Sequence, residues 1–328
     1  MQILITGGAG LLGTRLARAI LAHGSMTDAS GATCVVSKIT LFDIVPAAGF
    51  DDARVVSVVG DVANAAEIAA VLTPQTAAVF HLAAVVSGQA EADFDLGMRI
   101  NLDATRLLLE RARSNGNRPK FVFTSSVAAF GGSLPARVPD DHAPMPQSSY
   151  GMQKVVGELL VNEYSRRGFI DGRVLRMPTV CVRPGAPNRA ASSFASGIIR
   201  EPLNGIDAVC PVAPQTVMWL VSPAVAIANM IHGHEVDGAH FGSSRILSLP
   251  GLSVTVGEMA AALARVAGSA TAARITWQPD PAIERIVNSW PGDFATDRAD
   301  AMGFARDAGF DDIVRAYIEQ ELGGKPIA

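Results

Sequence analysis

Two side chains four residues apart, Tyr150 and Lys154, are the pair in this sequence best suited to move a proton. Residues at positions i and i+4 of a helix project from the same face, so the phenol and the ammonium would lie side by side. A tyrosine titrates near 10, and lowering its pKa by about 3 units takes about 4 kcal/mol of preferential stabilisation of the phenolate. A neighbouring cation and a desolvated site can supply this. The pair predicts that Tyr150 acts as a base.

A glycine-rich turn near the N-terminus predicts a dinucleotide site. Residues 2–6 are apolar and β-branched, as in a buried strand, and the glycines that follow are spaced three apart before apolar residues recur at helical spacing. Strand, glycine turn and helix in this order are the context that such a motif requires. The turn lets a pyrophosphate approach the backbone, and the helix start offers free N–H groups. The predicted contacts are Gly7, Gly10, Leu11, Leu12 and Gly13.

A carboxylate at the end of the second predicted strand bears on the choice of cofactor. The strand, residues 33–42, ends in Asp43, which is placed to accept hydrogen bonds from the adenosine ribose. This carboxylate would repel a 2′-phosphate, and residues 44–46 offer no arginine, so NAD is favoured over NADP. The alternative is a solvated strand-end acid. The spacing from Gly13 is longer than usual, which we attribute to a loop insertion at residues 26–32.

Residues at the ends of later predicted strands extend the same groove. Asp61 and Val62 follow an apolar run and would lie near the adenine. The small residues after His81 would line the groove, and Pro178 follows the last strand of the nucleotide-binding part. The residues predicted to line it are Asp61, Val62, Leu82, Ala83, Ala84 and Pro178.

Strand and helix signals alternate as far as residue 180, which predicts an α/β fold with a doubly wound parallel sheet. Prolines and glycines become denser after Pro178. We therefore predict an NAD-binding Rossmann domain, residues 1–178, and a smaller substrate-binding lobe, residues 179–328, with segments returning to the sheet.

Composition argues against several classes of protein. The net charge is −4 and the basic residues are scattered, which does not favour binding of nucleic acid. No apolar run of about 18 residues could span a membrane, and we expect no signal peptide. Three cysteines without metal-ligand spacing suggest buried thiols in a reducing cytoplasm. A metal site at His232 and His234 lacks a carboxylate cluster, and we expect these side chains to be solvated at a helix end.

Together these motifs resemble the extended short-chain dehydrogenase/reductases over essentially the whole chain. The residues that carry the resemblance are Gly7, Gly10, Gly13, Asp43, Asp61, Val62, Asn101, Ser125, Ser126, Tyr150 and Lys154. The resemblance implies that Tyr150 is the general acid/base and that Lys154 holds the nicotinamide ribose and lowers the Tyr150 pKa. It implies that Ser126, or as second choice Ser125, orients the substrate hydroxyl. It also implies that Asn101 belongs to the cofactor site and that the protein is a homodimer. A strand-end polar pair that caps backbone groups is the alternative for the two serines.

The second half of the chain departs from the nucleotide-sugar enzymes of that family. Val217 stands where those enzymes carry an arginine that grips the diphosphate, and Phe130 replaces a tyrosine. Residues 176–203 and 249–258 instead resemble members that oxidise a four-carbon sugar acid at C2, so D-erythronate is the expected substrate. Its predicted contacts are Ser126, Tyr150, Thr179, Arg183, Asn188, Ser192 and Ser193. A surface ion pair for Arg183, an epimerase or dehydratase acting on a nucleotide sugar, and a non-catalytic NAD sensor remain alternatives.

Overall fold

The computed structural model describes residues 1–325, which form two compact units. The first unit contains residues 1–126, 149–176 and 227–248, and the second contains residues 127–148, 177–226 and 249 onward. The first unit is therefore assembled from three stretches of chain. The last of these supplies a strand to the sheet of the first unit, so part of the C-terminal half returns to that sheet.

The first unit is built on a seven-stranded sheet in the order β12-β8-β7-β6-β1-β4-β5, with parallel pairing. Its core strands are short and almost wholly buried, as apolar β-branched sequences favour. The chain runs outward from β1 through β4 to β5 and then crosses back to β6, so the switch point lies between β1 and β6. The strands are β1 Gln2–Thr6, β4 Lys38–Asp43, β5 Val55–Val59, β6 Thr76–His81, β7 Lys120–Ser126, β8 Asp171–Met177 and β12 Ile246–Ser248. The predicted doubly wound α/β fold is confirmed.

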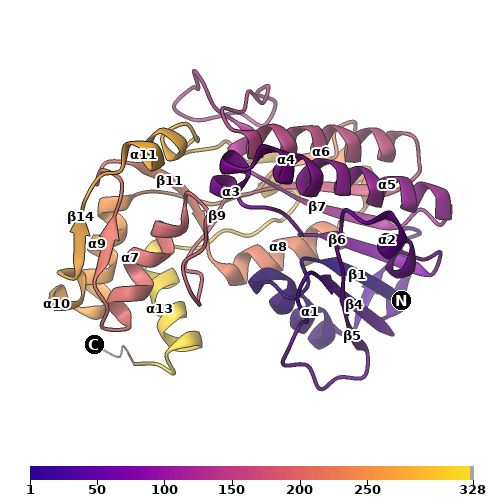
Figure 1. Ribbon diagram of the computed structural model, residues 1–328, viewed down its shortest axis with the longest axis horizontal. Coiled ribbons are helices and arrows are strands. Elements are labelled where there is room, and N and C mark those ends of the chain that lie inside the picture. The colour runs from indigo at the N-terminus through magenta and orange to yellow at the C-terminus, as the bar shows by residue number, and fades with distance from the viewer. Residues whose placement is uncertain (326–328) are drawn as a thin grey trace. The chain divides into compact units, whose positions relative to one another are not determined.

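Helices cover both faces of this sheet (Figure 1). The helices α5 and α6 lie on one face, whereas α1 and most of α8 lie on the other. A core of apolar residues from the strands and from α5, including Leu4, Phe121 and Leu108, fills one of these layers. The helices are α1 Leu11–His23, α2 Ala65–Val71, α3 Ser87–Ala92, α4 Phe94–Gly97, α5 Ala104–Asn115, α6 Ser149–Arg166 and α8 Pro223–Glu235.

The helical region between Ser87 and Asn115 is not one continuous helix. The helix α3 ends at Ala92, and the carboxylate of Asp93 accepts a hydrogen bond from Leu96 N at 3.0 Å, which caps α4. An aspartate that bonds to nearby backbone N–H groups competes with helix continuation. A π-helical segment, Met98–Asp103, then joins α4 to α5. The extra residue per turn places Asn101 inward, and such segments are frequent at functional sites.

The insertion near residues 26–32 is a hairpin, not a loop as expected. The strand β2, Ser25–Thr27, pairs antiparallel with β3, Thr33–Val35, so the predicted strand 33–42 is split between β3 and β4. The main chain and hydroxyl of Thr27 donate to the Glu235 carboxylate, the latter at 2.9 Å. A distant side chain therefore stabilises the hairpin.

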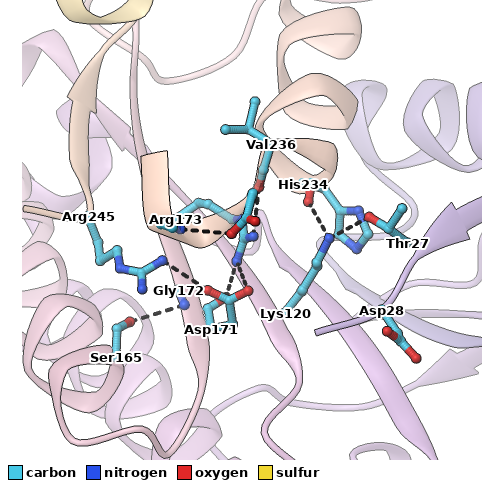
Figure 2. A network of polar contacts seen from close by, with 12 residues as sticks. Thr27, Asp28, Lys120, Ser165, Asp171, Gly172, Arg173, His234, Val236 and Arg245 are labelled. Atoms are coloured by element: carbon cyan, nitrogen blue, oxygen red, sulfur yellow. Dashed lines mark hydrogen bonds and ion pairs between the residues drawn. The ribbon is translucent and has the colours of Figure 1, made fainter. Parts of the chain in front are cut away.

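The buried C-terminus of α8 corrects the expectation that His234 is solvated. The His234 ring is fully buried and stacks on Phe80, and burial lowers its pKa to about 4. Figure 2 shows how buried cations meet carbonyls at the C-terminal end of α8: Lys120 Nζ donates to His234 O at 2.9 Å, and Arg173 Nη2 donates to the O atom of Val236, just beyond the helix, at 2.9 Å. Cations at a helix C-terminus satisfy its free carbonyls and oppose the helix dipole. Sequence alone did not reveal these distant partners.

The second unit has its own core and small sheets. A three-stranded sheet has the order β13-β11-β9, and β10 pairs with β14. The helices α7, α9 and α13 pack around a cluster that includes Ile198, Met259 and Val314. Its elements are β9 Thr179–Val180, α7 Ser193–Leu203, β10 Ala208–Cys210, β11 Val217–Val221, β13 Leu252–Thr255, α9 Val256–Ala267, α10 Ser269–Ala272, β14 Ile275–Trp277, α11 Pro281–Val287, α12 Asp297–Ala301 and α13 Phe310–Glu321.

The cysteines differ from expectation at one position. Cys181 and Cys210 are buried free thiols, whereas Cys34 on the β2–β3 hairpin is partly exposed. In the part of the chain that the structure describes, no helix combines the length and the hydropathy that crossing a bilayer requires. No cluster of metal-ligating side chains occurs among residues 1–325.

Candidate active site

The glycine turn between β1 and α1 brings three stretches of backbone into close contact. Gly7 has φ +70°, and a Cβ there would lie 2.8 Å from Ala83 N, so this position requires glycine. A Cβ on Gly13 would lie 2.3 Å from Gly7 O, which shows how closely α1 approaches the turn. The N-cap residue of α1 is Gly10, which has no side chain to cap the first N–H groups. These groups, which include those of Leu11 and Leu12, suit a bound anion.

A cavity of about 400 Å³ opens at the carboxyl ends of β1, β4, β5 and β6. Ligands bind at this edge of a parallel sheet, next to the switch point. The predicted residues that line it are Gly7, Gly10, Asp43, Asp61, Val62, Leu82, Ala83 and Ala84. Lining residues that the sequence did not indicate are Phe42, Ile44, Gly60, Val85, Gln89, Leu96, Arg99 and Ile100. The size and lining of the cavity fit the adenosine end of NAD.

The Asp43 carboxylate is fixed at the edge of this cavity. Ala9 N donates to Oδ2 at 3.0 Å and Ile44 N donates to Oδ1 at 2.7 Å. Each oxygen accepts one backbone hydrogen bond and retains a second lone pair for a ribose hydroxyl. The carboxylate is therefore oriented by the glycine turn itself.

Asp61 faces an arginine that sequence reasoning missed. Arg99 Nη1 lies 2.5 Å from Asp61 Oδ2, and Ala63 N donates to Oδ1 at 2.8 Å. Partial burial raises the pKa of Asp61, but the Ala63 amide and the Arg99 guanidinium outweigh it, so the pKa lies below its usual range. The two residues are 38 positions apart, and no local signal pairs them.

Tyr150 and Lys154 lie together on α6, as their spacing predicts. Lys154 Nζ lies 5.6 Å from the centre of the Tyr150 ring and 4.8 Å from that of Phe123. It donates to Thr124 O at 2.9 Å. Burial lowers the Lys154 pKa to about 8, and the Glu158 carboxylate limits that shift. The ammonium form therefore still predominates at pH 7.

The two serines at the end of β7 differ in their surroundings. Ser125 is buried and donates to Glu158 Oε1 at 2.5 Å. The same carboxylate accepts from Arg176 Nε and Nη2 at 2.9 and 2.7 Å, with Glu158 1% and Arg176 6% exposed. The Ser125 hydroxyl thus belongs to a buried ion pair that joins α6 to β8. Ser126, the last residue of β7, is the stronger candidate to meet a substrate.

Asn101 connects the π-helical segment to two neighbouring elements. Its Nδ2 donates to Val85 O at 3.0 Å and to Gln153 Oε1 at 2.7 Å, and its Oδ1 accepts from Val85 N at 2.8 Å. Val85 lines the cavity, and Gln153 precedes Lys154 on α6. Asn101 therefore connects the cavity wall to the helix that carries Tyr150 and Lys154. It does not line the cavity described above.

Of the seven residues predicted to contact the substrate, Ser126 and Tyr150 belong to the first unit and the other five belong to the second. Thr179 begins β9, and Pro178 precedes it as a buried residue. Arg183 N donates to Ser196 Oγ at 2.9 Å, and Arg200 Nη1 donates to Arg183 O at 2.8 Å. These contacts fix the Arg183 backbone. Sequence reasoning did not indicate Ser196 or Arg200, because both are buried inside α7.

Asn188, Ser192 and Ser193 lie at the loop that leads into α7. Asn188 Oδ1 accepts from Ala190 N at 3.0 Å, and Asn188 N donates to Ser193 Oγ at 3.2 Å. Ser192 is the N-cap residue of α7. Two of the three side chains therefore help to shape the loop, and their contact with a substrate remains a prediction.

The sheet, the glycine turn and the Tyr150–Lys154 pair define an NAD-binding α/β enzyme. The chain belongs to the NAD dependent epimerase/dehydratase family, whose model matches residues 3–216. This confirms the family resemblance and the expected cofactor.

Named relatives match nearly the whole chain. A D-erythronate dehydrogenase of Cupriavidus necator is 56% identical over 97% of this chain and 98% of its own length. A second D-erythronate dehydrogenase, from Haemophilus influenzae, is 43% identical over 98% of this chain and 100% of its own. A solved structure described as a nucleoside-diphosphate-sugar epimerase from Agrobacterium tumefaciens superimposes with a TM-score of 0.92 at 42% identity, over 99% of this chain and 95% of that one.

Proposed function

We propose that this protein oxidises the C2 hydroxyl of D-erythronate to 2-oxo-tetronate, with NAD as the hydride acceptor. The observation that carries the proposal is the 56% identity to a D-erythronate dehydrogenase over 97% of the chain, together with the Tyr150–Lys154 pair. The products are the oxo acid, NADH and a proton, so atoms and electrons balance.

Tyr150 acts as the general base in this proposal. As phenolate it removes the C2 hydroxyl proton while Ser126 orients that hydroxyl. NAD, when bound, would supply the acceptor for the hydride that leaves C2. Lys154 Nζ lies 5.6 Å from the centre of the Tyr150 ring, and a cation at this range favours the phenolate over the neutral phenol. Lys154 therefore assists Tyr150 as the base.

Residues of the chain would hold NAD in four places. The N–H groups at the start of α1 would bind the pyrophosphate, and Asp43 would accept hydrogen bonds from the adenosine ribose. Lys154 would hold the nicotinamide ribose, and Pro178 would contact the nicotinamide. The reach of the cavity from Gly7 to Asp61 supports this placement of the adenosine half.

Asp43→Ala is expected to raise the KM for NAD and to relax the preference for NAD over NADP. The substitution removes the carboxylate, and with it the hydrogen bonds to the ribose and the repulsion of a 2′-phosphate. Steady-state rates with both cofactors measure this. Asp51→Ala, which changes an exposed acid outside the cavity lining, is the control. An unchanged NAD/NADP ratio in Asp43→Ala would show that Asp43 is only a surface acid.

Arg183→Met is expected to raise the KM for D-erythronate about 10-fold or more if this guanidinium binds the substrate carboxylate. Arginine binds a carboxylate with two parallel hydrogen bonds, which would orient C2. The control is Arg189→Met, a neighbouring exposed arginine of the same loop. Equal KM values for Arg183→Met and the wild type would assign Arg183 to a surface ion pair.

An epimerase or dehydratase acting on a nucleotide sugar is the second candidate, because one solved relative is described as an epimerase. In that reaction the hydride returns to the product and no NADH accumulates. Val217 argues against it, since an isopropyl group replaces the arginine that grips a diphosphate. The test compares NADH absorbance with D-erythronate and with UDP-sugars. Sugar conversion without NADH, and no NADH from D-erythronate, would reject the proposal.

We also propose a cytoplasmic homodimer. Phe94 on α4 and Leu159 on α6, two helices in contact, are large apolar side chains that are 53% and 59% exposed. Exposed apolar side chains on neighbouring helices favour burial against a second copy. Sedimentation equilibrium should give the mass of two chains, and the mass of one chain at all concentrations would contradict the dimer.

A further inference from the structure

Three tryptophans of the second unit differ in what their indole N–H groups contact. Trp219 Nε1 donates to Leu249 O at 3.2 Å, and Trp277 on β14 is 37% exposed. Trp290 Nε1 is buried and has no hydrogen-bond partner among the described residues. A buried donor without an acceptor is costly, so such a group in an enzyme calls for an explanation.

Trp290 borders a second, much smaller cavity. Its walls are formed largely by Val127, Thr179, Val217, Met218, Trp219 and Trp290. Its volume is about 10 Å³, roughly the room that one water-sized group needs. Of these six side chains, Thr179 has a hydroxyl and the two tryptophans have indole N–H groups, whereas the other three are apolar. The Trp219 N–H already donates to Leu249 O, so it is not available to a ligand.

The chain itself links this cavity to the proposed reaction. Val127 directly follows Ser126, the residue proposed to orient the C2 hydroxyl, and consecutive Cα atoms lie about 3.8 Å apart. Thr179 is a predicted substrate contact. The cavity wall therefore includes a residue covalently attached to the proposed catalytic serine.

We propose that this cavity receives the C4 hydroxyl of the substrate, with the C4 carbon at its mouth, and that the Trp290 indole N–H donates a hydrogen bond to this hydroxyl. This inference rests on the proposed oxidation of D-erythronate. The apolar walls disfavour the C1 carboxylate, because an unpaired charge is expensive to bury. A terminal hydroxyl is uncharged, small, and able to accept from an indole. The cavity would thus set the chain length of the acid and exclude a nucleoside diphosphate.

The test measures kcat/KM with D-erythronate and with 2,3-dihydroxybutanoate, which has the same carbon chain without the C4 hydroxyl. Trp290→Phe keeps the ring but removes the N–H donor. It should lower kcat/KM for D-erythronate about 5- to 10-fold, the size of one neutral hydrogen bond, and leave that for 2,3-dihydroxybutanoate nearly unchanged. Trp277→Phe, the matched control, should change neither.

The outcomes separate this inference from the proposed function. Equal losses on both acids, or no loss on either, would overturn the role of Trp290 while leaving the oxidation intact. A wild-type protein that makes no NADH from D-erythronate would instead reject the proposed function and this inference with it. NAD binding by Trp290→Phe, measured by calorimetry, should match the wild type. If Trp290→Phe does not fold, quenching of wild-type tryptophan emission by D-erythronate but not by 2,3-dihydroxybutanoate supports the inference, and equal quenching overturns it.

Discussion

Tyr150→Phe is expected to lower kcat for NADH formation by about 10²- to 10⁴-fold, the usual contribution of a general base. The substitution removes the hydroxyl that takes the C2 proton and keeps the aromatic ring beside Lys154. NAD affinity should stay close to that of the wild type, because the cavity around Gly7, Asp43 and Asp61 is untouched. Stopped-flow or steady-state absorbance measures the rate, and calorimetry measures NAD binding.

Tyr164→Phe on the same helix is the matched control. Tyr164 hydrogen-bonds to Glu110, and partial burial together with that carboxylate raises the Tyr164 pKa to about 12. A tyrosine in this environment stays protonated at neutral pH and is no base, so its removal should leave kcat nearly unchanged. Full activity in Tyr150→Phe, or equal losses in the two variants, would show that Tyr150 is not the base.

Arg176→Met is expected to lower the free energy of unfolding by about 3–5 kcal/mol, because it leaves the Glu158 carboxylate buried without its charged partner. Among the described residues, the Ser125 hydroxyl would remain as the hydrogen-bond donor to that carboxylate. Urea unfolding followed by circular dichroism gives the value. The pair joins α6 to β8, so its loss also weakens the attachment of the helix that carries Lys154.

The double variant Glu158→Leu and Arg176→Met distinguishes the cost of an unpaired buried charge from the cost of lost packing. Both charges are then replaced by apolar side chains of similar volume, and such replacements are often neutral or stabilising. Its free energy of unfolding should therefore exceed that of Arg176→Met by several kcal/mol. A double variant as unstable as the single one would mean that the cost of Arg176→Met does not come from the unpaired carboxylate.

Most of the first unit could be predicted from the sequence because its signals are local. The strand Gln2–Thr6, the turn at Gly7 and the helix that follows are coded within about 20 consecutive residues. Tyr150 and Lys154 share a helix face, so their spacing alone places them together. In the second unit, α9 and α13 likewise bury apolar residues that recur at helical spacing.

Features set by distant partners could not be predicted. His234 is buried because Phe80 and Lys120 lie against it, and the hairpin at Thr27 is held by Glu235, 208 positions away. The ion pair of Asp61 and Arg99 and the small cavity beside Trp290 also join residues that are remote in sequence. A one-sequence reading detects periodicity and spacing, whereas these contacts depend on the tertiary fold.

The most direct test of the account uses D-erythronate labelled with deuterium at C2. If the C2 hydrogen leaves as hydride, the deuterium should appear in NADH, with 2-oxo-tetronate as the other product and a slower rate of the chemical step. If the deuterium stays in the acid or passes to solvent, and no labelled NADH forms, the proposed oxidation is contradicted.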